Sequence, residues 1–130
     1  MTGFRLPAAV VAAALTVAVA PAGASAAKLR LGVYDCEAYN FQTGYLDYKG
    51  SAKLLSGHRY QYAFGRHHSK LKHPKSGKYS ISGSKMKFKG GGLKNATGKI
   101  QASTGGSSPH FALYYKGKSS GISCYYVKKP

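Results

Sequence analysis

The sequence contains very little negative charge. Of its 130 residues only three are acidic, whereas 20 are lysine or arginine, which gives a formal net charge of +17 at pH 7. The acidic residues are Asp35, Glu37 and Asp47, and everything after Asp47 is purely cationic. A hydrolase that works through a pair of carboxylates would have to take both from this small set. The excess of positive charge instead favours polyanions as partners, in solution or at a surface.

Cysteine is equally scarce. Cys36 and Cys124 are the 2 cysteines of the chain. In an exported protein this number indicates one disulfide rather than a metal site or a redox pair.

Long apolar runs are absent from the chain except near the N-terminus. There, residues 7–20 are almost entirely Ala, Val and Leu, Arg5 precedes them, and small residues follow. This is the pattern of a secretory signal peptide, and its Ala/Val content is typical of bacteria. The run is shorter than the roughly 20 residues that span a bilayer. We expect a signal peptide at residues 1–27, a single secreted, extracellular domain at residues 28–130, and no transmembrane segment.

Helical periodicity is absent after the signal peptide, and short alternating runs take its place. In residues 78–89, apolar side chains alternate with serine and lysine on both sides of a Gly83-Ser84 turn. Strict alternation around a two-residue turn predicts an antiparallel hairpin with one buried face. The opposite, solvated face of this hairpin is almost all lysine.

Similar runs, separated by turns rich in Gly, Ser and Asn, predict further strands at residues 29–39, 45–55, 59–64, 97–103, 110–116 and 121–127. About eight strands with short connections predict an all-β fold, a small antiparallel up-and-down barrel or a closed meander. Cys36 lies in the first predicted strand and Cys124 in the last. These strands are neighbours only if the sheet closes on itself, so the expected disulfide favours closure.

Alternation also predicts which side chains face the core. In residues 45–55 the even positions, Leu46 among them, are expected to face inward, and odd ones such as Ser51 outward. In residues 59–64 the inward set includes Phe64. The glycine-rich residues 90–96 are expected to be a flexible loop.

The longest irregular stretch, residues 65–75, holds the densest positive charge. Its basic side chains are Arg66, His67, His68, Lys70, Lys72, His73 and Lys75. Together with Lys85, Lys87 and Lys89 of the hairpin, they are expected to form a continuous cationic patch that binds phosphates or sulfates. The alternative is an ordinary solvated loop, which most charge runs are.

Three of these residues, His67, His68 and His73, are also candidate metal ligands. Adjacent histidines point in different directions in an extended chain, no cysteine or carboxylate joins them, and neighbouring lysines repel a cation. We therefore predict no metal site and no cofactor. Protonation of these histidines at mildly acidic pH would add to the positive charge.

Several of the 11 tyrosines fall outside the inward-facing positions or near strand ends, namely Tyr39, Tyr45, Tyr114 and Tyr125. An exposed aromatic ring beside lysines can stack on a base or a sugar. Ordinary cross-strand packing on the wet face of a sheet is the alternative.

The function that best fits this pattern is binding and not catalysis. The expected protein is a monomeric, secreted, strongly basic binder of anionic polymers or surfaces, such as a cell-wall polymer, nucleic acid or acidic polysaccharide. One alternative is an inhibitor of an extracellular hydrolase, which would dock residues 65–75 or 104–109. Another is a secreted nuclease or toxin. It would need a general acid and base beside a cation, for instance Glu37 with His58 or His110 and Arg59.

Overall fold

The computed structural model describes residue 3 and residues 28–65, 71–102 and 108–130. The predicted signal peptide therefore lies outside the described residues apart from Gly3, as do Arg66, His67, His68 and Lys70. No helix in the described ranges is long and apolar enough to cross a membrane.

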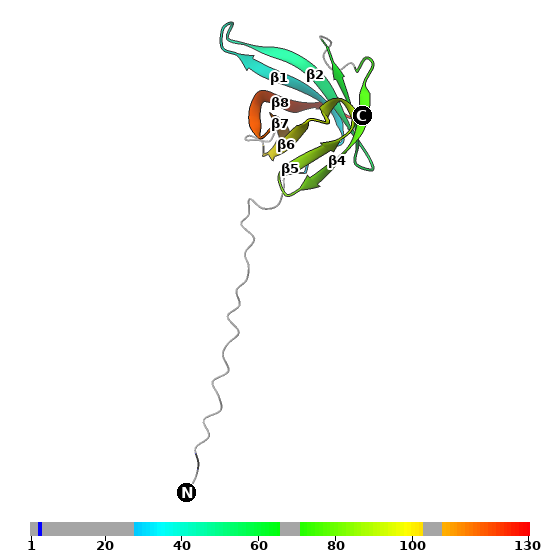
Figure 1. The fold of residues 1–130 in the computed structure, drawn as a ribbon, viewed down its shortest axis with the longest axis vertical. Helices are drawn as coiled ribbons and strands as arrows, with labels where there is room; N and C mark the ends of the chain where they lie inside the picture. The colour runs from blue at the N-terminus through cyan, green and yellow to red at the C-terminus, as the bar shows by residue number, and fades with distance from the viewer. Residues whose placement is uncertain (1–2, 4–27, 66–70, 103–107) are drawn as a thin grey trace.

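The described chain forms eight antiparallel strands that close into a barrel in the order β1-β2-β3-β4-β5-β6-β7-β8 (Figure 1). The strands are β1 (Gly32–Asn40), β2 (Tyr45–Leu55), β3 (Arg59–Phe64), β4 (Lys75–Ser82), β5 (Lys85–Lys89), β6 (Ala96–Gln101), β7 (His110–Tyr115) and β8 (Lys118–Lys128). Each strand pairs with the next along the chain, and β8 pairs with β1. The all-β, up-and-down barrel predicted from alternation is confirmed.

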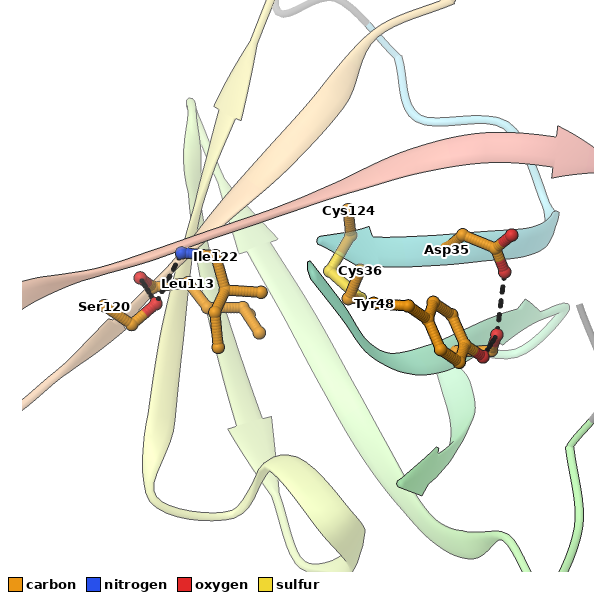
Figure 2. Close-up of a disulfide and its surroundings, with 8 residues drawn as sticks. Asp35, Cys36, Tyr48, Leu113, Ser120, Ile122 and Cys124 are labelled. Carbon is orange, nitrogen blue, oxygen red and sulfur yellow. Dashed lines mark hydrogen bonds between the residues drawn. A yellow bond between two sulfur atoms is a disulfide. The ribbon is translucent and has the colours of Figure 1, made fainter. Parts of the chain in front are cut away.

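Closure of the barrel is marked by the disulfide between Cys36 and Cys124. These residues are direct partners in the β1–β8 ladder, and their Cα atoms are 3.9 Å apart. Both side chains are fully buried. Figure 2 shows the disulfide together with Asp35 and Tyr48. The predicted bond and the closure argued from it are both confirmed.

Tightly packed side chains fill the barrel interior. The rings of Tyr34, Tyr60, Tyr62 and Phe111 are all at most 2% exposed, and Tyr34 packs on Phe111 with ring centroids 5.3 Å apart. Burial raises the pKa of Tyr34 and Tyr62. An eight-stranded barrel is just wide enough for side chains to fill it, and these large rings do so.

The glycine-rich residues 90–96 are not the flexible loop that their composition predicts. Gly91–Leu93 form a 3-10 turn, and Leu93 is 1% exposed within the core cluster. The Tyr60 hydroxyl donates a hydrogen bond to the Gly90 carbonyl oxygen and accepts one from the Leu93 backbone N–H at 2.9 Å. A core side chain 33 residues away therefore orders this connection.

Alternation gives the wrong side for a few residues. Opposite Cys36 the β2 partner is Gly50, whereas opposite Glu37 it is Tyr48, so Lys49 is an extra residue in a β-bulge. Ser51 keeps its expected outward side, opposite Asp35, but it is fully buried there and donates a hydrogen bond to the Asp35 carboxylate at 2.8 Å.

Two residues expected to face inward lie beyond the core. Leu46 is 59% exposed because the bulge places it opposite Tyr39, on the face away from Cys36, and because the pairing of β2 with β3 begins only at Gly50. Phe64, 64% exposed, is the last residue of β3 and leans on Tyr62 with ring centroids 4.8 Å apart.

Candidate functional site

Negative charge is confined to one side of the barrel. All three acidic residues are on β1 or β2, and β4, β5 and β6 contain none. In the closed order of eight strands, β5 is four strands away from β1 in either direction. The wall centred on β5 is therefore opposite the strand that carries Asp35 and Glu37.

The lysines of β5 all point outward from this wall. Met86 and Phe88 are 0% and 7% exposed and fill the interior, so Lys85, Lys87 and Lys89 face solvent. This matches the alternation of the predicted hairpin.

Strand register brings further cations beside them. Lys89 is directly opposite Lys78 of β4, and Lys78 is in turn opposite Arg59 of β3. On the other side, Lys85 is directly opposite Lys99 of β6. We call this surface the cationic face and define it by Arg59, Lys78, Lys85, Lys87, Lys89 and Lys99.

The geometry of the sheet makes these charges act together. Directly opposed Cβ atoms lie about 4.5–5.5 Å apart, and every second residue of a strand about 6.6–6.8 Å apart. Both spacings are below the Debye length of about 8 Å at physiological ionic strength. Salt therefore screens the charges only partly from one another, and their potentials add.

A shallow hollow of about 440 Å³ lies within this face. Lys85, Lys87, Thr97, Lys99 and Tyr114 are among the residues that line it. Tyr114 is half-buried and pairs with Thr97, which pairs with Lys87 on the next strand. A ring beside lysines in a hollow can take a planar or cyclic group of a polymer, and the cations can take its acidic groups.

The predicted binding residues are only partly brought together. Lys72 and His73 lie exposed just before β4, and Lys75 begins that strand. Lys75 and Lys78 are three residues apart on β4, so their side chains start from opposite faces of the sheet. Lys72 and Lys75 therefore lie at the barrel end next to the cationic face and not on it.

Sequence reasoning missed Arg59, Lys78 and Lys99 as members of this face. Lys78 precedes the buried Tyr79, and Lys99 lies between the buried Gly98 and Ile100, which was a usable signal for exposure. Their neighbours across the sheet depend on strand register, which alternation alone does not give.

The residues suggested for a nuclease do not meet in the barrel. Glu37 pairs with Tyr48, whereas His58 and Arg59 follow Leu55 at the far end of β2. Tyr48 and Leu55 are seven residues apart along β2, a distance of about 23 Å.

His110 is held elsewhere. Strand β8 lies between β1 and β7, so His110 is about two strand spacings, or 10 Å, from β1. The His110 ring stacks on Tyr125 with centroids 4.8 Å apart, and its Nε2 is 2.8 Å from the side-chain oxygen of Gln101. Burial lowers the pKa of His110. The contacts with Tyr125 and Gln101 hold the His110 ring in place on the barrel wall.

The part of the chain that the structure describes contains no group of three or more His, Cys, Asp or Glu side chains that could hold a metal ion. Of the three histidines weighed as ligands, His67 and His68 lie outside the described residues.

No protein-family model, curated protein or solved structure matches the chain. Its function must therefore be inferred from its own residues and their arrangement.

Charge reversal within the cationic face is expected to stabilise the fold. Lys89 lies opposite Lys78, and Lys99 lies opposite Lys85. The substitutions Lys89→Glu and Lys99→Glu therefore each replace a like-charged cross-strand pair with a pair of opposite charges. Each change should raise the free energy of unfolding by about 0.2–1 kcal/mol, measured by urea denaturation at low salt. Lys94→Glu is the control, because Lys94 is exposed but lies outside the strands. Equal midpoints for all these variants and the wild type would contradict the expectation.

Proposed function

We propose that this protein is a secreted binding protein that holds anionic polymers on its cationic face. The main support for the proposal is the strand register, which places lysines directly opposite one another: Lys78 opposite Lys89, and Lys85 opposite Lys99. Such pairs destabilise a sheet. A polyanion laid across them would remove the repulsion, and no side chain of β4, β5 or β6 can do so, because these strands have no acidic residue.

The hollow beside Tyr114 favours polymers that have rings as well as charge. Nucleic acids and acidic polysaccharides both meet this requirement, since every base has a stacking face and sugars pack on aromatic rings. A linear wall polymer with phosphates would use the lysines alone.

Export fits the same proposal. A disulfide persists in oxidising compartments outside the cytosol, and Cys36–Cys124 is such a bond. Outside the cell, a protein of this charge meets wall polymers, released nucleic acid and acidic polysaccharide.

The salt dependence of binding tests this proposal. Purified protein lacking residues 1–27 is titrated with single-stranded DNA, an acidic polysaccharide, a phosphate-bearing wall polymer and a neutral glucan. Affinity for at least one polyanion should fall log-linearly with salt, with a slope of about −0.7 to −0.9 for each phosphate-type contact. The neutral glucan should not bind. Absence of binding to every polyanion at low salt, or binding that salt does not weaken, would overturn the proposal.

A further inference from the structure

Four large apolar side chains are exposed together where β1 turns into β2. Tyr39, Phe41, Tyr45 and Leu46 are 52%, 89%, 75% and 59% exposed. We call this group the aromatic tip. Other rings of the same kind, such as those of Tyr34 and Tyr60, are fully buried, so exposure is not a general property of the aromatic residues in this chain. Clustered exposed apolar side chains mark interaction surfaces.

The turn that presents the aromatic tip is held in one shape. Asn40 accepts hydrogen bonds through Oδ1 from the backbone N–H groups of Gln42 and Thr43, at 2.9 and 3.3 Å. Its carbonyl oxygen accepts another from Gly44 at 2.8 Å. The rings of Tyr39 and Phe41 meet edge to face, with centroids 5.0 Å apart. The apolar side chains are therefore held outward by an ordered turn.

The aromatic tip also stands clear of the barrel. The β1–β8 ladder ends at Ala38, opposite Ile122, and the β2–β3 ladder begins at Gly50. Residues 45–49 of β2 therefore extend about 17 Å past the end of β3, and residues 39–40 and 45–46 also extend past the end of the β1–β8 ladder. Figure 1 shows the β1–β2 hairpin projecting as an arm from the rest of the sheet.

Basic side chains lie on the other connections at the same end of the barrel as this arm. In an up-and-down barrel, connections alternate between the two ends, so β1–β2, β3–β4, β5–β6 and β7–β8 share one end. The described basic side chains of the other three connections are Lys72, His73, Lys94 and Lys116. The arm itself carries Asp47, whose carboxylate accepts a hydrogen bond from the Asn40 amide at 3.0 Å.

We propose that the aromatic tip inserts into the headgroup region of an anionic lipid bilayer, with the lysines of the neighbouring connections on the lipid phosphates. Tyrosine is suited to a membrane interface because its ring is apolar and its hydroxyl is polar. Peripheral proteins hold such surfaces by combining a small apolar insertion with basic residues around it. Apolar side chains alone would fit a protein cleft equally well, and the basic residues on the connections at this end select the anionic surface.

This inference goes beyond the proposed function, because it uses other residues and another partner. The cationic face lies on the barrel wall, whereas the aromatic tip lies past the barrel end. One site can therefore fail its test while the other passes.

The absence of tryptophan provides a direct probe. The chain contains no Trp, so Phe41→Trp introduces a single reporter at the aromatic tip. Its emission should shift to the blue with vesicles of phosphatidylglycerol and phosphatidylcholine, and brominated acyl chains should quench it. Leu31→Trp is the control, because Leu31 is 43% exposed but precedes β1, at the opposite end of the barrel. The Leu31→Trp emission should not respond.

A tip variant tests the energetics of insertion. Replacing Phe41, Tyr45 and Leu46 with serine should weaken binding to these vesicles by about tenfold or more in sedimentation. Its melting curve and its binding of a soluble polyanion should match the wild type, because the replaced side chains are exposed and away from the cationic face.

Three outcomes would overturn the inference. One is equal vesicle binding by the serine variant, which would mean that charge alone holds the membrane. Another is a Phe41→Trp signal that is the same with pure phosphatidylcholine. The third is a concentration-dependent dimer in light scattering that the serine variant abolishes without any vesicle insertion. That result would assign the tip to a second copy of the chain.

Discussion

Replacing Lys85, Lys87, Lys89 and Lys99 with glutamine is expected to weaken binding of an anionic polymer roughly a thousandfold at about 0.1 M salt. Each lost phosphate-type contact reduces the log–log salt slope by about 0.7–0.9, so the four together reduce it by about 3. Counterion release contributes nothing to the affinity near 1 M salt. Between 1 M and about 0.1 M salt, a difference of about 3 in the slope therefore becomes a roughly thousandfold difference in affinity. Fluorescence anisotropy across a salt series measures both the affinity and the slope.

A variant with the same loss of charge provides the matched control. Lys49, Lys53, Lys128 and Lys129 lie on β2, on β8 or after it, away from the cationic face. Glutamine at these positions gives the same net charge, and we expect a decrease in affinity of less than about tenfold from the weaker overall field. Equal weakening by the two variants would contradict a localised site and leave only diffuse attraction by net charge.

The fold should survive the glutamine substitutions on the cationic face. The replaced side chains are exposed, Lys85 faces Lys99, and Lys89 faces Lys78, so the free energy of unfolding should be unchanged or slightly higher. A thermal melt of each variant separates a binding defect from a folding defect.

Much of this barrel could be predicted from the sequence because strand alternation is a local property. The predicted strands at residues 45–55 and 59–64 coincide with β2 (Tyr45–Leu55) and β3 (Arg59–Phe64). The outward lysines of β5 follow from the buried Met86 and Phe88 between them. The disulfide follows from the cysteine count in an exported chain, and closure of the sheet follows from the disulfide.

The register between neighbouring strands and the point at which each strand ends could not be predicted in this way. That Lys85 faces Lys99 depends on how β5 aligns with β6, which the pattern of either strand alone leaves open. Leu46 is exposed because the bulge at Lys49 shifts its side and because β3 ends before it, whereas unbroken alternation places it inward. The ordered connection at Gly91–Leu93 depends on the Tyr60 hydroxyl, a contact between distant parts of the chain.

Loss of the disulfide is expected to be the largest single change in stability. Cys36 and Cys124 are 88 residues apart, so opening the bond returns about 4.6 kcal/mol of loop entropy to the unfolded chain. Small domains have only about 5–15 kcal/mol of stability in total. At about 4–8 °C for each kcal/mol, the melting temperature should fall by roughly 20 °C or more.

A double alanine variant, Cys36→Ala with Cys124→Ala, gives this measurement without depending on access of a reductant to the fully buried sulfurs. Urea denaturation gives the free energy of unfolding of this variant. Wild-type protein that is unfolded and refolded in a reductant provides an independent comparison, because it lacks the disulfide but keeps both cysteine side chains. The backbone pairing of β1 with β8 runs from Val33 to Ala38 and does not require the sulfurs. In the cold, therefore, the variant should still fold and bind polyanion with the wild-type salt slope, because the cationic face is on the opposite wall. A stability loss below about 1 kcal/mol would mean that the β1–β8 ladder alone closes the barrel.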